Sequence, residues 1–130
     1  MAKEVLVNDG GAPARILPFV AAATGSAGDP ITINTAGKTI ACAVGFKVAG
    51  FLLTDVDAIG DLANVVMGHG CILNVTCKKD VEIGDVLQSG VARLDGVVNS
   101  ATIDFPEGAV AIALEAGDTV TDLPIKVLVL

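Results

Sequence analysis

The sequence predicts an all-β fold, a compact β-barrel or sandwich of short antiparallel strands with an extended N-terminal arm. Hydrophobic residues make up 52% of the 130 residues and aromatic residues only 3%, so Val, Ala, Leu and Ile form most of the apolar part. Val and Ile favour strands because their branched side chains fit a pleated surface. The short apolar runs also recur at roughly eight to twelve residues with Gly, Pro, Asn or Asp between them, a spacing typical of all-β sandwiches and barrels.

Each short apolar run is interpreted as a strand bounded by turn residues. Residues 3–8 form the first strand, and 15–30 are extended and then irregular, because Pro18 and Pro30 exclude a central strand at those points. Further strands are expected at 31–34, 39–44, 46–53, 70–77, 84–90, 91–96, 97–105, 109–114 and 124–130. A chain of this length suits one domain, which we place at 16–130 after an arm at 1–15.

Residues 55–67 are the one candidate for a helix. Asp55 or Asp57 can cap it, but Gly60 weakens it. We therefore predict a turn with at most one helical turn in this segment.

The charge and hydropathy of the chain bear on its partners. The net charge of −7 argues against nucleic acid, whose phosphates need clustered Lys and Arg. The mean hydropathy of +0.70 is high, yet no run of about 18 residues is free of charge, so no membrane span is expected. The first residues also lack the apolar stretch of a secretion signal. We infer that apolar surface is buried against partners in an oligomer or particle.

A short motif occurs twice, as VEIGDV at 81–86 and LEAGDT at 114–119. Gly adopts backbone angles that other residues avoid, and Asp can accept a hydrogen bond from a neighbouring backbone N–H. We therefore interpret Gly84, Asp85, Gly117 and Asp118 as structural corners between strands, with no catalytic role.

Three acidic residues, Asp55, Asp57 and Asp61, resemble a calcium-binding loop at first sight. An EF-hand needs a further oxygen ligand and a Glu at fixed positions, where this chain has Ile59 and Val66. A solvated acidic loop is the expectation, and a looser cation site stays an alternative.

The nucleophilic and metal-ligating residues are few. Cys42, Cys71 and Cys77 have no CxxC spacing, so buried free thiols are expected. His69 is the single histidine and lies two residues before Cys71, so a His–Cys nucleophile pair or a zinc site with distant cysteines stays open. Lys78 and Lys79 are expected in a solvated turn. We predict no catalytic residue, no cofactor and no metal.

The segment VEIGDVL also resembles the Gly–Asp corner of lipoyl and biotinyl carrier domains. Those families carry their Lys at the tip of a separate hairpin, whereas Lys78 and Lys79 directly precede the corner here. A carrier module is therefore the less favoured alternative.

From residue 39 onwards the order of motifs resembles the tailed-phage capsid decoration proteins, or cement proteins, of the small β-barrel or β-tulip kind. FKVAGFLLTDVDAIGD is followed by VVMGHGCILNVTC, then VEIGDVLQSG, then VVNSATIDFPEGAVAIALEAGDT and a last strand IKVLVL. The loop DVDAIGDLANV departs from the family pattern, and the first 38 residues add little to the resemblance.

The resemblance implies a structural protein that binds the outside of the mature phage head. Such proteins bridge neighbouring major capsid subunits, often as homotrimers, and assemble in the host cytoplasm without catalysis. On this basis an extended segment would add a strand to an edge of the major capsid protein. The candidate contacts are Lys3, Glu4, Val5, Leu6, Val7, Arg15, Ile16 and Leu17. Another self-assembling virion component, such as a shell subunit or a fibre base, is the alternative.

Overall fold

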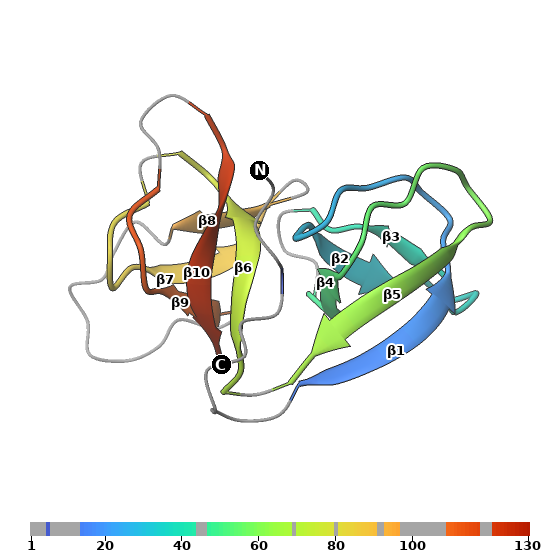
Figure 1. Cartoon of the computed structure of the whole chain (residues 1–130), viewed down its shortest axis with the longest axis horizontal. Coiled ribbons are helices and arrows are strands. Elements are labelled where there is room, and N and C mark those ends of the chain that lie inside the picture. Colours follow the sequence, from blue (N-terminus) through green and yellow to red (C-terminus); the bar gives the residue numbers. More distant parts are fainter. Residues whose placement is uncertain are drawn as a thin grey trace.

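The computed structural model of the chain describes residue 5 and residues 14–43, 47–68, 70–79, 81–90, 93–96, 109–117 and 121–130. The described residues form ten β-strands and no helix, which confirms the predicted all-β class. The strands are β1 (Arg15–Val20), β2 (Pro30–Ile33), β3 (Thr39–Ala41), β4 (Gly50–Leu52), β5 (Leu62–Met67), β6 (Ile72–Cys77), β7 (Val86–Ser89), β8 (Leu94–Gly96), β9 (Ala109–Ala113) and β10 (Leu123–Val129). Figure 1 shows them as two bodies side by side.

The first half of the chain forms an antiparallel sheet with the order β1-β5-β4-β2-β3. Strand β1 is an edge strand that pairs with β5 from Arg15↔Met67 to Val20↔Leu62. A single parallel bridge, Ala21↔Thr39, connects the end of β1 to β3. The sheet therefore curls until its two edges meet at one end, and within the part of the chain that the structure describes most of β1 keeps an open edge.

The second half pairs in a closed ring with the order β10-β6-β8-β7-β9. Neighbouring strands are antiparallel except β6 and β8, which are parallel and share one residue pair, Cys77↔Leu94. The longest pairing is β10 with β6, from Leu123↔Cys77 to Leu128↔Ile72. Ring closure is therefore weakest between β6 and β8.

One apolar core joins the two bodies. Phe51 of β4 and Val66 of β5 pack with residues of the second sheet, among them Leu73 and Val127. A smaller cluster, including Ile31, Leu52 and Val65, fills the other face of the first sheet. Because the first sheet buries residues on both faces, its central strands cannot show a simple alternation of polar and apolar residues.

Strand β5 corrects the prediction of a turn with one helical turn in 55–67. Leu62–Met67 is a central strand between β1 and β4. Its sequence LANVVM has no strict alternation, and Ala63, Val65 and Val66 are all fully buried. A short apolar run of this kind cannot be distinguished from a helical segment by periodicity alone.

The prediction that proline excludes a central strand was confirmed for one of the two prolines and wrong for the other. Pro18 lies in the edge strand β1, as a missing backbone N–H requires. Pro30 begins β2, which lies between β3 and β4, so the exclusion of a central strand there was wrong. The first residue of a strand tolerates proline because the ladder begins beyond its nitrogen.

Most other predicted strands are present. Strands at 31–34, 39–44, 70–77, 109–114 and 124–130 are found as β2, β3, β6, β9 and β10, with ends shifted by a few residues. The segments 46–53, 84–90 and 91–96 contain β4, β7 and β8. The segment 97–105, and 3–8 apart from Val5, lie outside the described residues.

Candidate interaction surface

Exposed apolar side chains gather on β1 and the start of β5. The exposed fractions are 45% for Ile16, 37% for Leu17, 44% for Val20 and 62% for Leu62. Val20 and Leu62 lie directly opposite each other in the β1–β5 register, so they share one face of the sheet. We call these four residues the β1–β5 strip, in which Ile16, Val20 and Leu62 share one face of the sheet and Leu17 lies on the other. Figure 1 shows β1 along the lower edge of the first sheet, beside β5.

The open edge of β1 can be assigned residue by residue. The backbone N–H of Ala21 donates to the carbonyl of Asp61 at 2.9 Å, so Ala21 faces β5. Backbone groups alternate along a strand, so Phe19, Leu17 and Arg15 also face β5, while Ile16, Pro18 and Val20 face outward. Pro18 offers an outward carbonyl but no N–H, because proline has none.

Charges of opposite sign lie at the two ends of the strip. Arg15 begins β1 and is exposed. Asp61 directly precedes β5, on the other end of the strip, and is exposed, as is Asp57 in the adjoining loop. The strip is therefore an apolar segment with a cation at one end and carboxylates at the other.

The predicted N-terminal contacts are described at one position only. Val5 is 3% exposed and belongs to the main core. Its carbonyl accepts a hydrogen bond from the backbone N–H of Asn74 at 2.7 Å. Val5 is thus inside the folded chain, where it has no surface to offer a partner. Lys3, Glu4, Leu6 and Val7 lie outside the described residues.

Val5 also supplies a hydrogen-bond acceptor to the part of β6 that does not pair with β8. The N–H of Asn74 donates to Val5, and the N–H of Thr76 donates to the carbonyl of Gly28 at 2.9 Å. Two distant parts of the chain therefore complete the β6 edge that the ring leaves open, as buried backbone donors require.

The two Gly–Asp motifs lie against each other. The N–H of Gly84 donates to the carbonyl of Ala113 at 2.8 Å, and the N–H of Gly117 donates to the carbonyl of Val81 at 2.7 Å. Gly84 has φ +89°, which favours glycine. Gly117 instead lies close to backbone, because a Cβ there would be 3.3 Å from the nitrogen of Val81. The hydrogen bonds of the two glycines thus hold the two turns against each other.

The aspartate of the first motif closes its own turn. The Asp85 carboxylate accepts a hydrogen bond from the N–H of Glu82 at 2.9 Å. Asp118 lies outside the described residues. Ile83, at the outer side of this turn, is 71% exposed.

Two aspartates of the acidic loop accept hydrogen bonds from backbone N–H groups, one outside the loop and one within it. The Asp55 carboxylate accepts a hydrogen bond from the N–H of Ala27 at 2.7 Å, and that of Asp61 accepts one from Ala58 at 3.2 Å. Within the described ranges, no group of three His, Cys, Asp or Glu side chains is placed to hold a metal ion. Likewise, no helix of the described residues is long and apolar enough to cross a membrane.

The three cysteines are buried, and they form no disulfide with one another in the described residues. The Cys71 thiol donates to the carbonyl of Gly68 at 3.0 Å, and burial raises the pKa of this thiol. Both features favour the protonated thiol over the thiolate that a nucleophile needs. His69, its suggested partner, lies outside the described residues.

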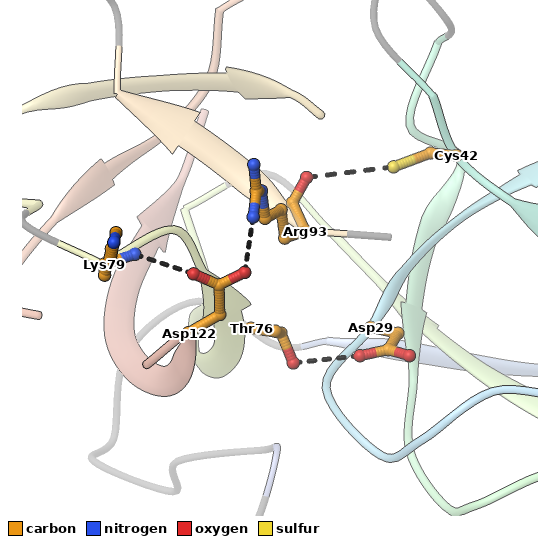
Figure 2. Close-up of polar contacts among 6 residues, drawn as sticks. All are labelled: Asp29, Cys42, Thr76, Lys79, Arg93 and Asp122. Carbon is orange, nitrogen blue, oxygen red and sulfur yellow. Dashed lines mark hydrogen bonds and ion pairs between the residues drawn. The ribbon is translucent and has the colours of Figure 1, made fainter. Parts of the chain in front are cut away.

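Polar contacts between the two bodies had no signal in the sequence. The hydroxyl of Thr76 donates to the Asp29 carboxylate at 2.9 Å (Figure 2). The Cys42 thiol donates to the carbonyl of Gly90 at 3.0 Å. Each contact joins residues more than forty positions apart, which no local pattern can predict. They fix the orientation of the first sheet against the second.

A second polar group lies beside β8 and β10 (Figure 2). Asp122 accepts hydrogen bonds from Arg93 at 2.6 Å and from the backbone N–H of Lys79 at 2.9 Å. The Arg93 hydrogen bond, followed by that of Lys79, holds the pKa of Asp122 below its usual value. The side chains of Lys78 and Lys79 are exposed, in the turn predicted for them.

Comparison with known proteins gives a likeness of fold. Neither a protein-family model nor a curated protein matches the chain. The structure is similar to the N base of the head fibre gp8.5 of bacteriophage phi29, with a TM-score of 0.68 and 18% sequence identity. The likeness covers 91% of this chain and 95% of the other. At this identity, what the two chains are shown to share is their fold.

Proposed function

We propose that the chain is a structural protein of a phage head, bound to the outer surface of the shell and without a catalytic role. The observation that carries this proposal is the likeness to a phage head fibre base over nearly the full length of both chains. The motif order from residue 39 onwards independently resembles capsid decoration proteins. The two lines of argument agree on a phage head and on a structural part.

Two finer forms of this function make different predictions. As a cement protein, the chain bridges neighbouring major capsid subunits and stabilises the mature shell, because a ligand that binds only one state favours that state. As a fibre base, it anchors a further projecting part. The solved neighbour favours the fibre base, whereas the sequence motifs favour the cement protein.

The β1–β5 strip is the assembly surface in this proposal. Of the candidate contacts, Arg15, Ile16 and Leu17 are exposed on the open edge strand β1. An edge strand with apolar side chains invites pairing with another chain. Val5 is excluded as a contact of the folded chain by its burial.

The test is quantitative mass spectrometry on gradient-purified heads from cells that produce the chain together with its genomic neighbours. We expect the chain to co-sediment with the major shell protein at a fixed ratio. A cement protein has a high ratio over the whole shell and raises the temperature at which heads open. A fibre base leaves that temperature unchanged and is lost together with a projecting fibre.

The matched variants are Ile16→Lys in the strip and Ile83→Lys at the distant turn, both exposed positions. Loss of head binding for the first and not for the second shows that assembly on the head depends on the strip, through contact with the shell or through pairing of two copies. A wild-type chain that stays in the soluble fraction contradicts the proposed function.

A further inference from the structure

We propose that the β1–β5 strip binds a second copy of this chain, with the two β1 strands antiparallel across a twofold axis. This inference rests on the proposed function only in taking the strip as an assembly surface. It names the occupant of that surface from the charges and backbone groups of β1.

The charge pattern of the strip is self-complementary. Arg15 lies at one end, and Asp61 lies at the other, opposite Ala21 and next to Leu62. In an antiparallel pair, each end of one strip meets the opposite end of its copy. Arg15 of each chain then lies near Asp61 of its partner, so attraction acts twice in a chain whose net charge is −7.

The faces of the sheet agree with this pairing. Arg15 and Ala21 are six positions apart on an extended strand, so they share a face, and Asp61 faces Ala21 across the sheet. With Leu17 opposite its own copy, Arg15 lies opposite Phe19. Measured from Arg15, Asp61 of the copy is then about two residues further along and two strands across, or about 12 Å between backbones by standard strand spacings. At this separation the two charges attract each other over the surface without forming a close ion pair, so the attraction is weakened by salt.

The open edge can form hydrogen bonds in the same register. Ile16 lies opposite Pro18 of the copy, so the N–H of Ile16 donates to the proline carbonyl, and the symmetric bond forms in return. The missing N–H of Pro18 prevents a longer ladder. The C-terminal end of β1 is already covered, since the N–H of Ala22 donates to the carbonyl of Thr39 at 2.9 Å. A short pairing that closes on itself is expected, and it leaves no open edge at β1 for a third copy.

Self-association also supports the proposed role at a shell. A dimer carries two identical surfaces for the shell and can bind two shell sites at once. Such linked binding raises the overall affinity without any new kind of contact. The strip then acts between the two copies, and other surface of the chain meets the shell.

The test is the mass of the purified full chain by sedimentation velocity and light scattering over a wide range of concentration. The expected mass is twice the 13.0 kDa of one chain. Ile16→Lys is expected to raise the dissociation constant at least about tenfold, since it places charge at the centre of the pairing. Ile83→Lys is the matched control and should leave the mass unchanged.

Charge reversal supplies an independent readout. Arg15→Glu and Asp61→Arg are each expected to weaken the dimer, and the double variant to restore it, because both charges are then reversed together. Thermal unfolding checks each variant, since Asp61 also accepts a hydrogen bond from Ala58. If the double variant does not recover association, the proposed attraction between Arg15 and Asp61 is wrong.

Each remaining outcome has a defined meaning. A monomer at all concentrations, a trimer, or a dimer that Ile16→Lys leaves intact overturns the twofold pairing. A trimer would indicate the threefold arrangement implied by the decoration-protein resemblance. A monomer that still co-sediments with heads retains the proposed function without this inference, whereas a dimer that never binds heads retains the inference without that function.

Discussion

At the residue scale, the close approach of neighbouring strands requires glycine at position 50. Gly50 begins β4, between β2 and β5. A Cβ at this position would lie 2.5 Å from a methyl of Val65 and 2.7 Å from the carbonyl oxygen of Val66. The second contact is with backbone, which cannot move without disturbing the β4–β5 pairing.

Gly50→Ala is therefore expected to lower the free energy of unfolding by about 1–3 kcal/mol, the usual cost of overpacking. Gly37→Ala is the comparison, because its Cβ would meet nothing within 4 Å and its φ of +77° is the one source of strain. Denaturant titration followed by far-UV circular dichroism measures both. Equal losses for the two variants would show that the contact at Gly50 relaxes easily.

Asp122 gives a prediction on pH. Its pKa is lowered in the folded chain by Arg93 and by the N–H of Lys79, so the folded state favours the carboxylate. The resulting stability is present above the unfolded pKa of about 3.9 and is lost as pH falls through the lower folded pKa.

Asp122→Asn should therefore destabilise the chain at neutral pH, by no more than about 1 kcal/mol because the ion pair is partly exposed. The difference from the wild-type chain should shrink below pH of about 4. Urea unfolding at neutral and acidic pH measures it. A difference that is constant with pH would mean that the carboxylate charge is not involved.

At the element scale, the two segments that contain the predicted contacts differ in exposure where the structure describes them. The segment KEVLVN has the pattern of a strand that can bind a partner, yet Val5 is in the core and completes the edge of β6. RILPFV, whose proline excludes a central strand, forms the edge strand of the first sheet and is mostly exposed.

Val5→Ala is expected to cost about 2 kcal/mol of folding free energy, from the buried methyl groups and the cavity that they leave. Ile83→Ala, at an exposed position outside the strip, should change it by less than about 0.5 kcal/mol. Thermal or denaturant unfolding compares the two. If Val5→Ala is as mild as Ile83→Ala, Val5 is not part of the stable core.

The same argument affects any truncation of the arm. Deleting residues 1–11 removes Val5 together with the candidate contacts Lys3 to Val7. A loss of head binding in that deletion is informative about binding only if the shortened chain is as stable as the full one.

At the scale of the whole molecule, the shared core predicts one cooperative unit. Phe51 and Val66 of the first sheet pack with Leu73 and Val127 of the second. Gly28 connects the same two bodies, because its N–H donates to Leu52 and its carbonyl accepts from Thr76.

Hydrogen exchange should therefore show the same highest protection in β5 and in β6, since both open only on global unfolding. The chain has no Trp or Tyr, so exchange measured by mass spectrometry is better suited than fluorescence. Two separate levels of protection, one for each sheet, would mean that the bodies unfold independently. Thr76→Val, which removes the hydroxyl bond to Asp29, should lower both levels together by about 1 kcal/mol.

The sequence alone determined the class of fold, most strand positions and the turn at the first Gly–Asp motif. These features depend on local physics, namely the β preference of Val and Ile and the turn preference of Gly and Asp. Tertiary structure decided which strands are central, as at β5, and which apolar residues are exposed, as at Ile16 and Leu62. Burial depends on which segments meet in space, and the contacts that decide it join residues such as Val5 and Asn74 that are far apart in the chain.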